Sequence, residues 1–290
     1  MASMQSASPS VGYGGRRSLK PPVWTWEVPL YFFVGGAAGA SAAIAFGALL
    51  AGQPALARAA LWVAAGGGAV SPLLLTSDLG RPARALNMFR VFKLRSPMSV
   101  GSWSLLLFGT SSAAALLLHW LGWRVLTLAA SAVAALAGLI LATYTGVLVA
   151  VSVIPVWRAQ ARWLPAYAGA TALGAAAAVL VLLVPEAVAA RRLLLVAALA
   201  ECAAAAVVEL SHSSAERPLH HGRAGRLLRT GGILAGPLTA AALLLLPLER
   251  WSQVLASVAF LAGGLLLRFG WIAAGRASAN DPAALLDAGR

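Results

Sequence analysis

The sequence predicts an all-α membrane protein with eight transmembrane helices. The prediction rests on composition: 60% of the 290 residues are hydrophobic, only 11% are charged, and the mean hydropathy is +0.81. A soluble core does not need this much apolar sequence. Because a transmembrane helix takes about 20 apolar residues, eight helices use a little over half of the chain and leave short loops and two tails.

Eight apolar segments follow one another between two predicted tails, residues 1–22 and 277–290. Trp24 and Trp26 are typical of an interfacial anchor before the first helix. Continuous apolar runs such as Leu173–Val184 favour helices over the alternating strands of a membrane barrel, because hydrocarbon leaves backbone groups without partners. The predicted helices span residues 27–50, 56–79, 99–121, 125–153, 165–185, 192–213, 226–248 and 252–275.

Several residues recur at a spacing of 136 positions, which indicates an internal repeat. The recurring pairs are Pro29 and Pro165, Tyr31 and Tyr167, Arg81 and Arg217, Pro82 and Pro218, and Arg90 and Arg226. Tyr occurs only four times in the chain, so the tyrosine pair is informative. Four helices return a chain to its starting side. The sequence therefore predicts two four-helix bundles, residues 23–157 and 158–276, related by a parallel pseudo-repeat.

The net charge of +13 would suggest nucleic-acid binding in a soluble protein, but here its placement matters more than its size. Of the 22 Lys and Arg residues, sixteen lie on the side of the N-terminus, five lie on the opposite side, and Arg268 lies inside the last helix. The positive-inside tendency predicts a bacterial inner-membrane protein with both termini in the cytoplasm. A basic loop that docks a partner protein would give the same counts, so this alternative stays open.

The composition argues against several redox centres within the chain. The single cysteine, Cys202, cannot form an internal disulfide, and an iron–sulfur cluster needs about four cysteine ligands. Haem b needs paired histidines at membrane depth, whereas the four histidines lie near helix ends and in a loop. Too few carboxylates lie inside the helices for a metal site. We therefore expect no haem, cluster or metal in this chain.

Ionisable and amphipathic residues gather at one end of the first four helices. Glu27 and Tyr31 are four residues apart and share one face of the first helix. Asp78 and Arg81 close the second helix, and Tyr144 lies near the end of the fourth. Polar groups at this depth are usually functional, although a lone tyrosine is more often an interfacial anchor. Their convergence predicts a pocket for a carbonyl-bearing amphiphile such as a quinone.

A second set of charges lies in the other half. Glu201 and Glu209 are eight residues apart in the sixth helix, His212 follows three residues later, and Arg268 in the eighth helix is the predicted counter-charge. This set predicts either a proton path, Glu201, Glu209, His212 and Arg268, or a structural salt bridge that makes the buried charges tolerable. The residues alone do not choose between the two.

The longest polar stretch carries a family resemblance. It contains Asp78-Leu79-Gly80-Arg81-Pro82, an arginine-bearing loop, and Ser96-Pro97-Met98-Ser99 before a glycine and a tryptophan. This string resembles the signature of the NrfD, or polysulfide reductase membrane-subunit, family. Supporting matches are the Trp26–Tyr31 entry to the first helix and Tyr144-Thr145-Gly146. The eight-helix count fits the whole chain, but the specific motifs lie in its first half.

The resemblance implies a membrane anchor that reacts with quinone, most simply menaquinone, and has no redox centre of its own. Electrons would pass between the quinone and a docked ferredoxin-like iron–sulfur subunit, which is itself coupled to a molybdopterin-type or similar catalytic subunit. By motif position, the quinone site would comprise Glu27, Tyr31, Asp78, Arg81 and Tyr144. The residues that would meet the partner are Arg84, Arg90, Lys93 and Arg95.

One topological expectation conflicts with the resemblance. In the best-known complexes of this family the partner faces the outside, whereas the charge count places the signature loop inside. Two other functions also fit the residues: a proton-coupled transporter, which eight helices with buried Glu and Arg would suit, and a structural anchor without an active quinone site. Co-purification of an iron–sulfur subunit would favour the quinone function over transport, and bound quinone would exclude the bare anchor.

Overall fold

The structure is a computed structural model of the chain, and the residues it describes are 19, 21–78, 87–90, 92–93, 96–211, 214–246 and 250–281. Every regular element formed by these residues is helical. The longer helices are α1 (Glu27–Leu50), α2 (Pro54–Asp78), α3 (Pro97–Trp120), α4 (Arg124–Ala150), α6 (Leu164–Leu183), α7 (Val188–Glu209) and α11 (Arg250–Ala279). The shorter elements are α5 (Pro155–Ala159), η2 (Ser214–Glu216), α8 (Arg217–His220), α9 (Gly222–Arg226), η3 (Leu227–Leu238) and α10 (Thr239–Leu245).

The prediction of an all-α, multi-pass membrane fold is confirmed. Seven helical segments among the described residues are long and apolar enough to cross a membrane, one of them being the continuous stretch 222–245. The remaining long helix, α7, has 22 residues but carries four charged side chains, Arg191, Arg192, Glu201 and Glu209. These charges interrupt its apolar surface and set it apart from the other long helices.

One predicted helix differs in form from the expectation. The segment predicted as a single helix over 226–248 consists of α9, the π-helical η3 and α10. Within η3, Pro237 lacks the amide proton of a regular helical hydrogen bond, and three glycines lower the helix propensity. The backbone also packs very closely on α11, since a Cβ at Gly236 would overlap Gly263. A regular α-helix is therefore weakly specified here.

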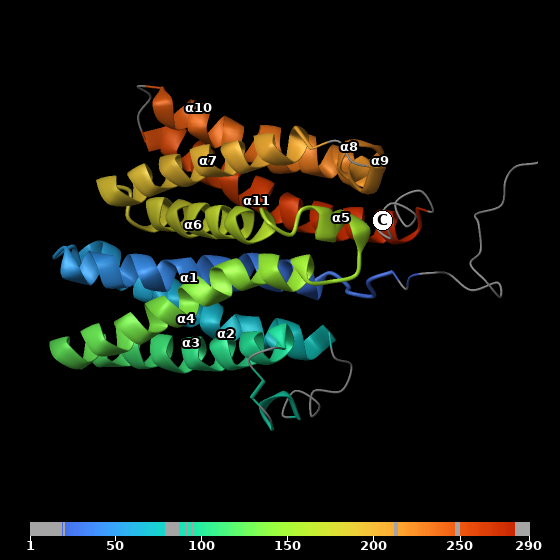
Figure 1. The fold of residues 1–290 in the computed structure, drawn as a ribbon. Coiled ribbons are helices and arrows are strands. Elements are labelled where there is room, and N and C mark those ends of the chain that lie inside the picture. Colours follow the sequence, from blue (N-terminus) through green and yellow to red (C-terminus); the bar gives the residue numbers. More distant parts are fainter. Residues whose placement is uncertain are drawn as a thin grey trace, which may run out of the picture.

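The helices form two groups that lie side by side (Figure 1). In the first group α1 contacts α2 and α4, and α3 contacts α4. In the second group α6 contacts α7 and α11, and η3 and α10 contact α11. The groups meet where α6 packs against α1 and α4. The start of α1 and the end of α11 lie at the same end of the molecule, which we call the N-terminal side (Figure 1).

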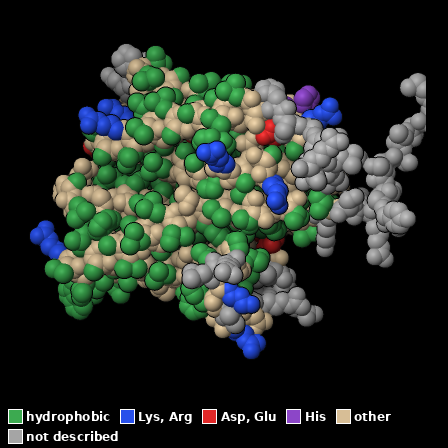
Figure 2. Space-filling model, viewed as in Figure 1, with side chains coloured by type: hydrophobic (Ala, Val, Ile, Leu, Met, Phe, Trp, Pro, Cys, Tyr) green, Lys and Arg blue, Asp and Glu red, His purple; other side chains and the backbone are tan. Residues whose placement is uncertain are grey.

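Small residues allow the helices of the first group to approach closely. α1 and α4 cross where Gly39 faces Gly138, and a Cβ on either glycine would overlap the backbone of the other helix. Such backbone approach is a general feature of helix packing in membranes. Outside this contact the surface is apolar along the length of the helices (Figure 2), with large exposed side chains such as Val125 and Leu136. This distribution suits a surrounding of lipid.

Candidate functional site

A cavity of about 180 Å³ lies at the N-terminal side of the first helix group. Each of the four helices contributes part of its wall, for example α1 with Tyr31, α2 with Asp78, α3 with Ser102 and α4 with Tyr144. The chain directions explain this meeting: α1 and α3 begin at this side, while α2 and α4 end here. Residues far apart in sequence are thereby brought to one place.

The structure brings three of the five predicted quinone residues, Tyr31, Asp78 and Tyr144, to this cavity. Glu27 does not line it but lies one helical turn before Tyr31 and is linked to Asp78 through Thr25. The Thr25 hydroxyl donates to the Glu27 carboxylate, and its oxygen lies 3.2 Å from Asp78 Oδ1. The fifth residue, Arg81, lies outside the described residues.

The cavity wall is mainly apolar, with few polar groups directed at a ligand. Val28, Phe32 and Leu105 are among its apolar side chains. Two lining hydroxyls are already engaged within their own helices: Thr76 donates to the Leu73 carbonyl at 3.0 Å, and Ser102 donates to the Met98 carbonyl at 2.8 Å. The remaining lining polar groups include the two tyrosine hydroxyls and the Asp78 carboxylate. They could donate to, or exchange a proton with, a bound carbonyl or hydroxyl.

Gly101 makes room for the Tyr144 ring. The glycine lies in the second turn of α3 and lines the cavity, and a Cβ at this position would overlap the ring and hydroxyl of Tyr144. Tyr144 is 7% exposed, so its ring has little space to retreat except into the cavity. The absence of a side chain on α3 therefore fixes where a tyrosine from α4 can lie.

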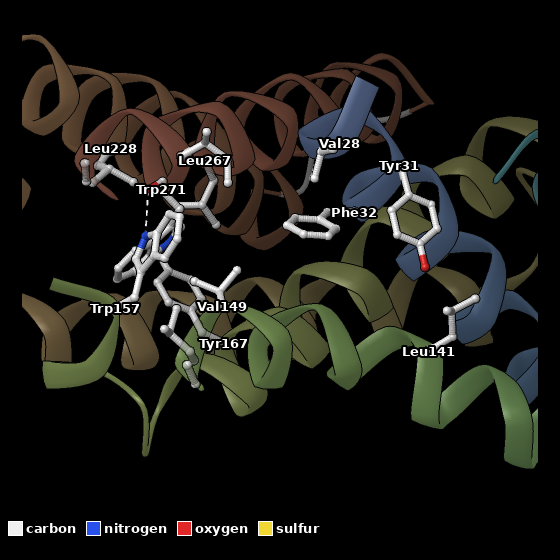
Figure 3. Packing of buried hydrophobic residues seen from close by; sticks show 14 of the residues in the cluster. Val28, Tyr31, Phe32, Leu141, Val149, Trp157, Tyr167, Leu228, Leu267 and Trp271 are labelled. Atoms are coloured by element: carbon white, nitrogen blue, oxygen red, sulfur yellow. Dashed lines mark hydrogen bonds between the residues drawn. The ribbon is translucent and has the colours of Figure 1, made fainter. Parts of the chain in front are cut away.

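Trp24 forms a wall of the cavity and is held by residues that follow the first four long helices in the chain. Its ring stacks on Trp157 of α5, with centroids 5.6 Å apart and planes 15° apart, and packs edge-on against Phe32. Its carbonyl accepts a hydrogen bond from the Arg276 guanidinium at the end of α11. Trp157 is fixed in turn, because its Nε1–H donates to the Trp271 carbonyl at 2.9 Å (Figure 3). We call these contacts the Trp24 brace.

The described residues 87–90 of the loop predicted to dock a partner lie next to the cavity. Arg90 and Lys93 are exposed there, whereas Arg84 and Arg95 lie outside the described residues. Phe89 lines the cavity and packs edge-on against Trp103 of α3, with ring centroids 5.8 Å apart. The exposed charges are thus within a few residues of the cavity wall.

The second helix group holds a buried pair of opposite charges. Glu201 is fully buried on α7, and neither of its carboxylate oxygens has a hydrogen-bond partner among the described residues. Arg268 on α11 is 7% exposed and donates to the Ala168 carbonyl at 3.0 Å. It also lines a small cavity of about 20 Å³ with Tyr167. The direct salt bridge that the sequence offered as one alternative is not formed between these two described side chains.

Glu209 has partners that the sequence did not reveal. Arg229 of η3 donates two hydrogen bonds to its carboxylate, at 2.9 and 2.5 Å, and His220 Nδ1 lies 3.4 Å from the same group. The ion pair ties the end of α7 to η3. His212, which was predicted to extend the set, lies outside the described residues. The structure therefore separates Glu209, with partners near a helix end, from the buried Glu201.

Taken together, the fold and the cavity define a class: a multi-pass helical membrane protein with a mainly apolar cavity at one end of its first helix group. No family model matches the chain, and no curated protein matches it.

Proposed function

We propose that the chain is a quinone-binding membrane subunit of an oxidoreductase complex, of the NrfD type that its sequence motifs resemble. The observation that carries the proposal is the meeting of Tyr31, Asp78 and Tyr144 in one mainly apolar cavity. A quinone head is a flat apolar ring with two carbonyl oxygens. Apolar walls with a few hydroxyl and carboxyl groups are the surroundings that such a ligand needs.

The electrons would reach the quinone from another chain. With one cysteine in the whole sequence, the chain cannot supply the usual four thiolates of an iron–sulfur cluster. The exposed Arg90 and Lys93, beside the cavity wall, would attract an acidic ferredoxin-like partner and bring its cluster close to the quinone. A molybdopterin-type catalytic subunit would complete the complex, and menaquinone is the quinone that we favour.

We further propose that α7 is an eighth transmembrane helix and that the two helix groups are a parallel duplication. In support, α7 packs on α6 as α2 packs on α1, and α11 packs on α6 as α4 packs on α1. Adding 136 to the bounds of α1 and α2 gives segments that overlap α6 and α7 along most of their length. The segment 222–245 and α11 match α3 and α4 only at a spacing shorter than 136 residues. Charge counts then favour a bacterial inner-membrane orientation with both termini in the cytoplasm.

Transport remains a second candidate, supported by the buried Glu201 and Arg268. Charged side chains at this depth are costly and are commonly kept for ion or proton movement. Such movement, through Glu201, Glu209, His212 and Arg268, could also accompany quinone chemistry in the same protein. Uptake assays in proteoliposomes without any redox partner would show the transporter directly.

The decisive experiment is to purify the chain from its native membrane with its associated subunits. The expected result is co-purification of an iron–sulfur protein and of extractable menaquinone in an amount comparable to that of the chain. Neither quinone nor an iron–sulfur subunit in a folded, stable preparation would contradict the proposal. Quinone without a partner subunit would leave a binding protein and remove the electron-transfer role.

Substitutions in the cavity give a quantitative test. Tyr144→Phe removes one hydrogen bond to the quinone and should lower turnover of a menaquinol analogue about fivefold, since a lost bond costs about 1 kcal/mol. Asp78→Asn removes a proton acceptor and should lower turnover about a hundredfold. Both variants should keep their subunits. Glu186→Gln, which removes an exposed carboxylate far from the cavity, is the matched control for Asp78→Asn. Wild-type turnover in both cavity variants would remove these residues from the site.

A further inference from the structure

We infer that Thr25 passes protons between the cavity and the water on the N-terminal side, connecting Asp78 to Glu27. This inference rests on the proposed quinone function and adds a route that the function requires. Oxidation of a quinol releases two electrons and two protons, and reduction of a quinone takes up the same number. The electrons travel to or from the iron–sulfur partner, but the protons need a path through this chain.

The geometry of the three side chains supplies that path. Asp78, at the end of α2, lines the cavity and is within reach of a bound ligand. Thr25 lies before the start of α1 and is exposed, and its hydroxyl contacts both Asp78 and Glu27. Glu27, in the first turn of α1, is partly exposed. The three groups therefore connect the cavity wall, at Asp78, with two side chains that reach the surface outside the cavity.

A hydroxyl is suited to the middle position, because it can donate one proton and accept another at the same time. Thr25 carries one hydroxyl proton, so it can donate to only one of the two carboxylates at any moment. When Asp78 holds a proton, that proton can move to the Thr25 oxygen while the Thr25 proton moves to Glu27. Rotation of the hydroxyl then restores the starting arrangement.

The quinol chemistry balances along this route. One O–H bond of the quinol breaks and its proton goes to Asp78, while an electron goes to an oxidised iron–sulfur centre of the partner. The proton leaves through Thr25 and Glu27 to water, and Asp78 is then free to accept the second proton as the second electron departs. Quinone reduction uses the same steps in reverse.

The test compares Thr25→Val and Thr25→Ser in the assembled complex. Valine matches the shape of threonine without the hydroxyl, so kcat for a menaquinol analogue should fall about tenfold while KM stays near the wild-type value. Water can replace part of the route, and the loss should therefore be smaller than the usual ~100-fold cost of a missing acid–base group. Serine keeps the hydroxyl and should restore most of the rate. Thr143→Val is the matched control, because that partly exposed hydroxyl bonds the carbonyls of Leu139 and Ile140 in its own helix.

A second readout separates proton transfer from a structural role. Because Thr25 is exposed, a small buffer such as imidazole can reach the gap, and raising its concentration should restore kcat of Thr25→Val but leave the wild type unchanged. If the valine instead lowered kcat by displacing Asp78, added buffer would not restore the rate. If Thr25→Val retains its quinone and turns over at the wild-type rate, or if buffer has no effect on a slow variant, the relay is wrong. If the wild-type complex holds no quinone, the proposed function has failed instead.

Discussion

Replacement of Gly101 by Ala is expected to abolish quinone binding and to lower turnover by at least a hundredfold. The new methyl group would occupy the space of the Tyr144 ring, and this ring is packed on its other sides. The ring would therefore turn into the cavity, whose volume of about 180 Å³ is of the order of a few side-chain groups. Displacement of a positioned group by about 1 Å is enough to lose a hundredfold in rate. Extractable quinone per chain and steady-state turnover are the measurements.

The control for this variant lies two turns along the same helix. A methyl group at Gly109 would have its nearest neighbour, the Gly68 carbonyl oxygen, 3.5 Å away, which is an ordinary contact. Gly109→Ala should therefore keep both quinone and turnover. Thermal unfolding of the two variants in detergent should differ little. Full quinone occupancy in Gly101→Ala would show that the ligand does not use this cavity.

Replacement of Gly39 by Ala is expected to be among the most destabilising single changes in the first helix group. Its methyl group would overlap the carbonyl of Gly138, so α1 and α4 would have to separate along their contact. Overpacking in a tight interior costs about 1–3 kcal/mol, and a backbone obstacle that cannot rotate away places this variant at about 3 kcal/mol. Thermal unfolding of the purified protein would show the loss as a lower midpoint.

The matched control is Gly47→Ala in the same helix. No atom lies within 4 Å of a methyl group at this position, and alanine is a better helix former than glycine by about 1 kcal/mol. Gly47→Ala should be neutral or slightly stabilising. An equal loss of stability in both variants would show that helix propensity, and not the approach of α1 to α4, governs the effect.

Hydropathy predicted most of the fold because a membrane fixes both the length and the composition of a spanning helix. The bounds of α1, α4 and α6 lie within a few residues of those predicted. The segment 222–245 was harder, because hydropathy does not distinguish an α-helix from the wider π-helical turns around Pro237. α7 was predicted as a span on length and its apolar stretches, but its four charges interrupt the continuous apolar surface that the other long helices have.

The candidate site was predictable in part for the same reason. Because successive helices alternate in direction, Tyr31, Asp78 and Tyr144 must lie near the same side of the membrane. Their meeting in one cavity then requires only that α2 and α4 both pack against α1. Thr25 was not predicted, because a single hydroxyl before a helix has no distinctive pattern. The pairing of Glu209 with Arg229 was missed because it depends on the packing of η3 against α7.

The Trp24 brace has a consequence for the order in which the protein matures. Trp24 is synthesised before the residues that hold it: its ring rests on Trp157 and its carbonyl is bound by Arg276, which follows more than 250 residues later. Domains generally fold in order from the N-terminus during synthesis. Here the cavity of the first half acquires its last wall only after α11 has been inserted. A chain truncated before the end of α11 would thus carry an unfinished cavity, and completion of the ligand site reports that α11 has been made and inserted.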